Sequence, residues 1–269
     1  MKRRVGTSGF TIMETMIVLA VTAGLFVLIA ATLGGRQRSN EFTQAINDVR
    51  TVIQQAITET QSGFYANKGD FTCTRVGMSA NISGSANTQG KNKDCVFLGK
   101  VIQFGIAGTD PEEARVYPIV GLRTATSFVA AAPTPVYRSG VVNESTDFKL
   151  KYGLKTVKMV SGGSQIGAFG VLSSIDSSNP GKSGDQQFSV YGVRGTNITS
   201  DSNDQAAQHI QSAFASGSYD INPSGGVKVC FESGGTPQYG LVTVGDNGGQ
   251  LSVDLKIIDK SMVGTPCGI

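Results

Sequence analysis

Residues 9–35 read GFTIMETMIVLAVTAGLFVLIAATLGG, and this stretch decides how the chain is organised. Its last 21 residues, 15–35, carry no charge. As an α-helix they would extend about 32 Å, which matches a hydrocarbon layer of about 30 Å. A secretory signal peptide would have a shorter apolar region ending at a cleavage site, whereas Arg36 and Arg38 follow this one. The stretch therefore predicts a single membrane-spanning helix, and its flanking basic residues weakly favour a cytoplasmic N-terminus.

Glu14 is a carboxylate inside an otherwise apolar stretch. A charge in the hydrocarbon centre costs about 2.5–3.5 kcal/mol, so it calls for a partner. A chain that began at Phe10 would have an α-amine one helical turn away, about 6 Å along the axis. This amine would be a counter-ion within the chain or in a neighbouring one. The alternative is a carboxylate near the membrane edge that extends to the interface.

The residues from Lys2-Arg3-Arg4 through Gly9-Phe10-Thr11-Ile12-Met13-Glu14 to the long apolar run resemble the class III signal of type IV pilins and type II secretion pseudopilins. The resemblance covers residues 2–62. It implies that a membrane prepilin peptidase cuts after Gly9 and N-methylates Phe10. It also implies that Glu14 pairs with the amine of a neighbouring subunit during assembly, which favours this role over extension to the interface.

The resemblance implies a structural subunit, either a pilin or a minor pilin or pseudopilin. Its partners would be other pilin subunits in a helical filament, the peptidase, an inner-membrane assembly platform and membrane lipid. The prepilin would cross the cell membrane once, and the assembled protein would lie in an extracellular pilus or a periplasmic or cell-surface pseudopilus. Several major pilins carry a helix-breaking proline where this chain has Ala31, and no proline precedes Pro111. Without that proline, the pair Gly34-Gly35 is still a point at which the helix is weak.

Residues 41–62 keep helical spacing, so one helix is expected to run from the membrane into the rest of the chain. The apolar positions are Phe42, Ala45, Ile46, Val49, Ile53, Ala56, Ile57 and Thr60. The expected divisions are a leader at 1–9, a transmembrane and assembly helix at 10–35, its amphipathic continuation at 36–62 and a globular domain at 63–269.

Beyond residue 62 the chain has a composition typical of a turn-rich β domain, with 35 glycines in the whole sequence and no tryptophan. The expected strands are 100–106, 148–160, 169–175, 187–193, 226–232, 239–245 and 250–258. The last three resemble the carboxyl-terminal strands of H-type minor pseudopilins and related minor pilins. The fold class is α+β, with the long N-terminal helix packed on an antiparallel β-rich globular domain.

Two short helices are expected within the β pattern, one starting at Thr109-Asp110-Pro111-Glu112-Glu113 and one spanning residues 201–214. Asp201, Asn203 and Asp204 at the start of the second could bind calcium or cap the helix. The group lacks the glycine and distal glutamate of a calcium loop, which favours capping, and no metal site is predicted.

The four cysteines are Cys73, Cys95, Cys230 and Cys267, and no two have the Cys-x-x-Cys spacing of a zinc or redox site. In a translocated domain they predict two disulfides. The pairs that close local loops are Cys73 with Cys95 and Cys230 with Cys267. Reduced thiols would instead be buried as small apolar groups.

The charge pattern does not favour nucleic acid as the main partner. The formal charge is +3, and without Lys2, Arg3 and Arg4 the chain has 20 basic and 20 acidic side chains. A DNA-binding minor pilin of a DNA-uptake pilus is the alternative function, because the expected strand 148–160 would place Lys149, Lys151 and Lys155 on one face. Lysines also protect an exposed edge strand against pairing with another chain.

The sequence offers no catalytic residues and no cofactor motif. The single histidine, His209, has no matched cysteine or serine setting. Gly181-Lys182-Ser183 resembles part of a phosphate-binding loop, but Asp176 stands where the first glycine belongs. We therefore expect a structural protein rather than an enzyme.

Overall fold

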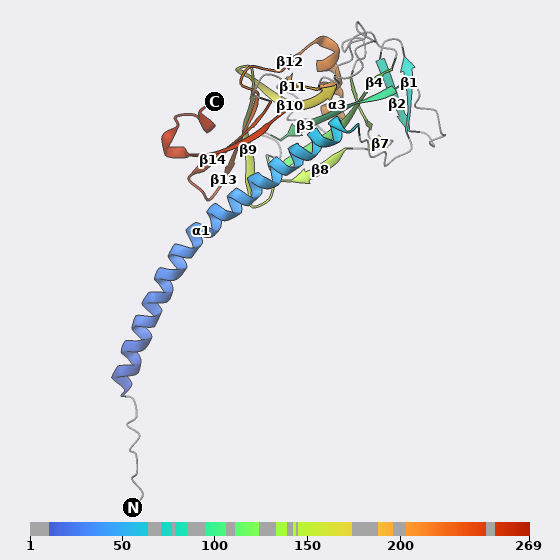
Figure 1. Cartoon of the computed structure of the whole chain (residues 1–269). Helices are drawn as coiled ribbons and strands as arrows, with labels where there is room; N and C mark the ends of the chain where they lie inside the picture. Colours follow the sequence, from blue (N-terminus) through green and yellow to red (C-terminus); the bar gives the residue numbers. More distant parts are fainter. Residues whose placement is uncertain are drawn as a thin grey trace, which may run out of the picture.

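The structure is a computed structural model, and it describes residues 11–63, 71–76, 79–84, 95–105, 111–123, 133–138, 142–143, 145–173, 188–195, 203–245 and 251–269. Figure 1 shows a long helix, α1 (Ile12–Gln61), that leaves a β-rich domain at one end. A second helix, α3 (Asn203–Ser216), lies within the domain, and the 3-10 turns η2 (Lys260–Met262) and η3 (Pro266–Gly268) follow the last strand.

The described domain contains fifteen strands. They are β1 (Phe71–Val76), β2 (Ser79–Gly84), β3 (Cys95–Phe104), β4 (Glu113–Leu122), β5 (Thr134–Pro135), β6 (Tyr137–Arg138), β7 (Val142–Asn143), β8 (Thr146–Lys149), β9 (Leu154–Ser161), β10 (Ser164–Ser173), β11 (Phe188–Arg194), β12 (Tyr219–Ile221), β13 (Val227–Ser233), β14 (Gln238–Val244) and β15 (Val253–Asp259). Every strand pair among the described residues is antiparallel. The α+β class with an N-terminal apolar helix is therefore confirmed.

The main sheet divides at β10. Its first residues, Ser164 and Gln165, pair with β9, whereas the residues from Ala168 onward pair with β3 on one side and β11 on the other. One part of the sheet has the order β9-β13-β14-β15, and the other has β12-β11-β10-β3-β4. The predicted meander of the last three strands is confirmed, because β14 pairs with both β13 and β15.

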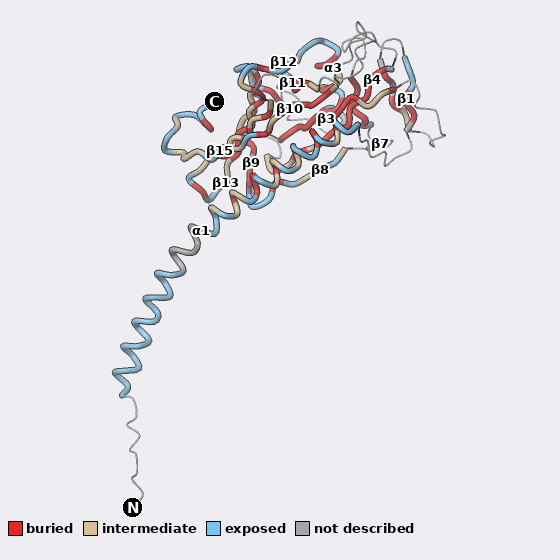
Figure 2. The backbone as a smooth tube through the Cα atoms, in the orientation of Figure 1, coloured by how far each residue is buried: buried red, intermediate tan, exposed pale blue. Residues whose placement is uncertain are grey.

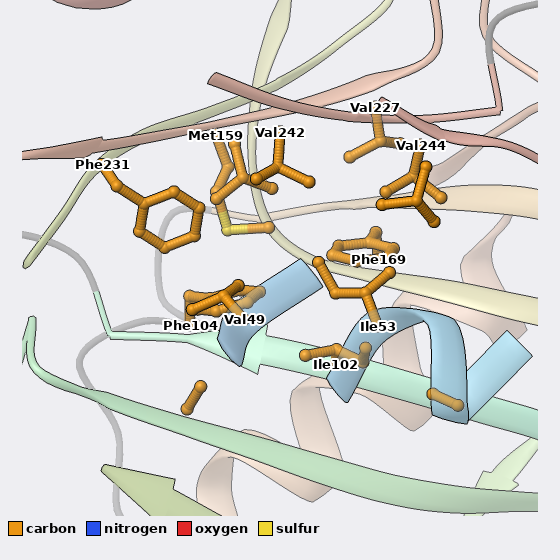
Figure 3. Packing of buried hydrophobic residues seen from close by; sticks show 14 of the residues in the cluster. Val49, Ile53, Ile102, Phe104, Met159, Phe169, Val227, Phe231, Val242 and Val244 are labelled. Atoms are coloured by element: carbon orange, nitrogen blue, oxygen red, sulfur yellow. The ribbon is translucent and has the colours of Figure 1, made fainter. Parts of the chain in front are cut away.

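Two apolar cores lie on the two faces of β3 and β10. The larger core joins both parts of the sheet to the second half of α1, and Figure 3 shows Val49 and Ile53 of α1 among side chains of β3, β10 and β13. Phe104 is central to it, with ring contacts to Phe169 and Phe231 at 6.4 and 5.5 Å between centroids. The smaller core lies between the opposite sheet face and α3, and it includes Tyr117, Tyr191, Ile210 and Phe214.

Helix α1 is continuous over 50 residues. It begins after Thr11, whose side chain caps its first turn, and its backbone remains helical through Gly34 and Gly35. It ends at Gln61, and Gly63 then takes a φ of 66°, a conformation that glycine adopts without a Cβ clash. The predicted run of one helix from the apolar segment into the amphipathic segment is confirmed.

The other predicted elements are confirmed in most places. The strands expected at 100–106, 169–175, 187–193, 226–232, 239–245 and 250–258 correspond to β3, β10, β11, β13, β14 and β15. The helix expected at 201–214 corresponds to α3.

The single strand expected at 148–160 is wrong. The segment forms β8 and β9 with a turn between them, in which Tyr152 and Gly153 have φ values of 56° and 64°. Two successive residues in the left-handed region cannot continue an extended strand. The continuous strand predicted at 148–160, with Lys149, Lys151 and Lys155 on one face, is therefore broken at this turn.

The helix start expected at Thr109–Glu113 is also wrong where the structure describes it. Pro111 and Glu112 form a turn, and Glu113 begins strand β4. Strand β4, which contains Pro118, was not predicted from the sequence. This proline lies beyond the residues that pair with β8 and before those that pair with β5, and its carbonyl accepts a hydrogen bond from the Val136 amide at 2.9 Å. A proline is tolerated there because the strand partner on that side changes.

Candidate functional site

Helix α1 has two halves with opposite surroundings, as Figure 2 shows by colour along the tube. The segment Ile12–Ile29 is long and apolar enough to cross a membrane, and none of it is buried in the structure. Its large apolar side chains, such as Ile17, Phe26 and Leu28, are exposed. An exposed apolar surface of this length is not stable in water, so it requires an apolar environment outside the chain.

The second half of α1 carries a buried stripe at helical spacing. The buried positions are Phe42, Ala45, Ile46, Val49, Ile53, Ala56 and Ile57. These are the apolar positions expected from the sequence. Contact with β14 is close, because a Cβ added at Gly240 would lie 1.8 Å from the Cδ1 of Ile46. Only a glycine fits at this position while Ile46 keeps its place.

Glu14 closes a reciprocal cap at the start of α1. Its Oε2 accepts hydrogen bonds from the backbone amide and the hydroxyl of Thr11, each at 3.1 Å, and the Thr11 hydroxyl accepts from the Glu14 amide at 3.3 Å. This capping box satisfies amides that the first helical turn leaves unpaired, and it places the carboxylate at the positive end of the helix dipole. The single described chain thus gives Glu14 local partners.

This cap was not predicted from the sequence, although its signal is present there. Thr11 and Glu14 have the Thr-x-x-Glu spacing of a capping box immediately before an apolar run. Gly9 and Phe10, the predicted cleavage and methylation residues, lie outside the described residues. Cleavage, methylation and the intermolecular role of Glu14 stay predictions.

Two ion pairs join the second half of α1 to the β domain. Glu59 pairs with Lys100 of β3, and Asp48 pairs with Lys151 in the β8–β9 turn at 2.9 Å. The hydrogen bond from Lys151 and the charge of Asp48 raise the pKa of Lys151. Lys151 therefore stays protonated at physiological pH.

Both predicted disulfides are present, Cys73–Cys95 and Cys230–Cys267, and the described residues contain no free cysteine. The first bond joins β1 to the start of β3, and the second joins β13 to η3 near the C-terminus of the sequence. Disulfides of this kind indicate an oxidising, extracytoplasmic compartment.

The three lysines of the alternative DNA-binding hypothesis do not share one strand face. Lys149 ends β8, Lys151 lies in the turn, and Lys155 lies in β9. Lys151 pairs with Asp48, and Lys155 lies 3.7 Å from a carboxylate oxygen of Glu112. Strand β9 pairs with β13 along its length and with β10 only at Val160 and Ser161, so Lys155 lies where β9 has a single strand partner.

The residues considered for metal binding or catalysis are only partly described. Asp201 and Gly181-Lys182-Ser183 lie outside the described residues, as do the side chains of Asn203 and Asp204 in the first turn of α3. His209 lies half-buried on α3. Within the described residues, no three His, Cys, Asp or Glu side chains gather as a metal site would require.

A pocket lies between β2, β5, β6 and α3. The polar residues that line it are Asn81, Thr134, Tyr137, Gln208 and Gln211. These groups are uncharged at neutral pH, and the lining contains no carboxylate, histidine or cysteine to act as a catalytic base or nucleophile. The two halves of α1 are therefore the most informative functional feature of the described chain.

Comparison of the chain with protein-family models, with curated proteins and with solved structures finds no match.

Proposed function

We propose that this protein is a structural subunit, a pilin or a minor pilin or pseudopilin, of a type IV pilus-like filament. The observation that carries the proposal is the division of α1 into an exposed apolar half and a half buried in the domain core. A subunit with this helix would be held in a membrane before assembly and would pack its apolar half against other subunits afterwards. The proposal does not require a catalytic site.

In the membrane state, the exposed half of α1 is the single anchor of the prepilin, and the N-terminus is cytoplasmic. Hydrocarbon accepts this half because its backbone amides and carbonyls are paired within the helix. The disulfide-bonded domain then lies on the oxidising side of the membrane. In the filament, the same apolar side chains contact neighbouring helices in place of lipid.

Glu14 has a different partner in each state. Before assembly, the cap with Thr11 reduces the cost of placing a carboxylate near lipid, because hydrogen bonds replace part of its hydration. During assembly, the α-amine of Phe10 in a neighbouring subunit, which exists only after cleavage at Gly9, becomes its counter-ion. Processing therefore creates the charge that assembly uses.

Mass spectrometry of the mature protein tests the processing step. We expect a chain that begins with N-methylphenylalanine at Phe10, because the basic leader and the apolar run meet there. A mature chain that begins at Met1, or one cut beyond residue 30, would contradict the proposal.

Variants of Glu14 test the assembly step. The Glu14→Ala variant should still insert and be cut at Gly9, because its span is more apolar, but it should not enter filaments. The Glu14→Gln variant keeps an oxygen that can accept from Thr11 but loses the charge, so it should also fail, whereas Glu14→Asp should retain part of the activity. The measurement is sheared filament that contains each variant, normalised to processed protein in the membrane.

The matched control is Thr11→Ala, which removes the capping hydroxyl and keeps the carboxylate. Loss of one cap destabilises a helix by about 1 kcal/mol, so this variant should fray the first turn and still enter filaments. Incorporation of Glu14→Ala at the level of the parent protein would show that the carboxylate is not the assembly contact.

A further inference from the structure

We propose that the end of the β domain nearest the anchor contacts the headgroup layer of the same bilayer that holds α1, through Tyr152 and the loop Gly234–Thr236. We call this surface the domain base. The inference rests on the proposed membrane anchor and adds a lipid contact that the anchor alone does not require. It concerns the subunit before it enters a filament.

The position of the domain base follows from the length of α1. The uncharged run ends at Gly35, and Arg38 lies three residues later, about 4.5 Å along the helix axis. A Cβ added at Gly235 would lie 3.3 Å from the Cδ of Arg38, so the β13–β14 loop is in contact with that side chain. The headgroup layer on each side of a bilayer is about 5–7 Å thick. The loop is therefore at headgroup depth when the apolar run spans the hydrocarbon.

Tyr152 lies in the β8–β9 turn, and a hydrogen bond holds this turn next to the β13–β14 loop. The hydroxyl of Ser233, the last residue of β13, donates a hydrogen bond to the Tyr152 carbonyl at 3.3 Å. The adjacent Lys151 pairs with Asp48 of α1, which holds the turn against the helix. The turn and the loop therefore lie side by side where α1 leaves the domain (Figure 1).

Tyr152 has two properties that a purely structural turn residue does not need. Its side chain is 47% exposed, and its φ of 56° places a bulky residue in the left-handed region. This backbone conformation is unfavourable in a non-glycine residue, because its Cβ lies too close to the following carbonyl oxygen. Burial of the side chain in the core does not offset this cost, because Tyr152 is among the few large apolar side chains that the described domain exposes.

The chemistry of the domain base fits a lipid interface. Tyrosine prefers the boundary between hydrocarbon and water, because its ring is apolar and its hydroxyl can bond to water and phosphate. Arg38 beside it is an exposed cation that can approach lipid phosphates. The occupant is therefore the bilayer of the anchor, because α1 holds the base next to that surface.

The absence of tryptophan from the sequence gives a direct test. Three full-length single-tryptophan variants, Tyr152→Trp, Ile221→Trp and Phe26→Trp, are reconstituted into vesicles of phosphatidylcholine and phosphatidylglycerol that carry a fluorescence quencher at headgroup depth or at mid-chain depth. Ile221 is the matched control, because it is 53% exposed on β12, far from the exposed half of α1 (Figure 1). Phe26 reports on the anchor itself.

We expect Trp fluorescence in the Tyr152→Trp variant to be quenched by headgroup quenchers about threefold more strongly than in Ile221→Trp, as befits an interfacial aromatic residue. Phe26→Trp should respond to the mid-chain quencher. If Phe26→Trp responds and Tyr152→Trp is quenched no more than Ile221→Trp, the domain base does not touch lipid and the inference is overturned while the anchor stands. If Phe26→Trp does not respond, the proposed anchor is wrong and the lipid contact falls with it.

Discussion

The two halves of α1 have the same backbone structure and opposite relations to the rest of the molecule. Ile17 in the first half is 59% exposed, whereas Ile53 in the second half is completely buried. The first half is apolar on all sides, and the second half is apolar on one side only. The distribution of apolar residues around a helix, more than their number, determines whether its partner is a surrounding apolar phase or a single surface.

The strongest test of this comparison substitutes the same residue type in each half. Ile53→Ala should destabilise the β domain by about 3–4 kcal/mol, because it removes buried methyl groups and leaves a cavity in the larger core. Ile17→Ala should leave the free energy of unfolding of the domain unchanged. The measurement is urea unfolding of the full chain in detergent micelles. Similar effects of the two substitutions would show that the halves do not differ as described.

Alkaline pH should destabilise the β domain before it affects the exposed half of α1, so this test of the comparison needs no mutation. Burial raises the pKa of Tyr117 to about 12, although the charge of Arg115 acts in the opposite direction. Burial, and to a smaller extent the nearby Tyr219, raises the pKa of Tyr191 to about 12. Both tyrosines lie in the core that α3 covers, and α1 contains no tyrosine. Deprotonation therefore opposes folding of the domain and has no direct effect on the exposed half of α1.

The direction follows from the raised pKa values. Stability is complete below the ordinary tyrosine pKa of about 10 and falls as the pH rises from there toward 12, by roughly 1 kcal/mol per group at about pH 11. Circular dichroism of the chain in vesicles should show loss of β structure before loss of the exposed half-helix. In Tyr117→Phe the slope of stability against pH should be smaller, and an unchanged slope would exclude Tyr117 as its source.

Close contact between α1 and β14 gives the next prediction. Gly240→Ala should destabilise the domain by about 1–3 kcal/mol, because the added Cβ would meet Ile46 at 1.8 Å and Phe42 at 3.5 Å. Gly234→Ala is the control, because a Cβ there has no atom within 4 Å. A second substitution, Ile46→Val, should restore part of the loss in Gly240→Ala. Absence of any rescue would place the strain elsewhere.

Local signals made α1 and the disulfides predictable. The helix follows from an uncharged run, a periodic stripe and the absence of proline, all of which lie within neighbouring residues. The pairs Cys73–Cys95 and Cys230–Cys267 are the ones that close local loops, and the structure contains both. The cap between Thr11 and Glu14 was equally local, and it was missed because Glu14 was considered only for its charge.

The errors lie where pairing between distant strands outweighs local preference. Pro111 and Glu112 have the features of a helix start, yet Glu113 joins β4, which pairs with β3 from Ala114 to Leu122. The segment 148–160 was expected to form one strand, yet the turn at Tyr152 lets β8 pair with β4 and β9 pair with β13. The spacing of residues along the sequence does not show which distant strands will pair with each other.

The smallest expected effect concerns the ion pairs beside the buried stripe. A double-mutant cycle with Glu59→Gln and Lys100→Met should give a coupling energy of about 0.5–1 kcal/mol, because the two side chains are only 21% and 17% exposed. The corresponding cycle for Asp48 and Lys151 should give a smaller coupling that high salt removes, because both side chains are far more exposed. Urea unfolding in low and high salt measures both. If either coupling matched the loss caused by Ile53→Ala, charge rather than apolar burial would hold the second half of α1 to the domain, and the contrast between its two halves would need a different physical basis.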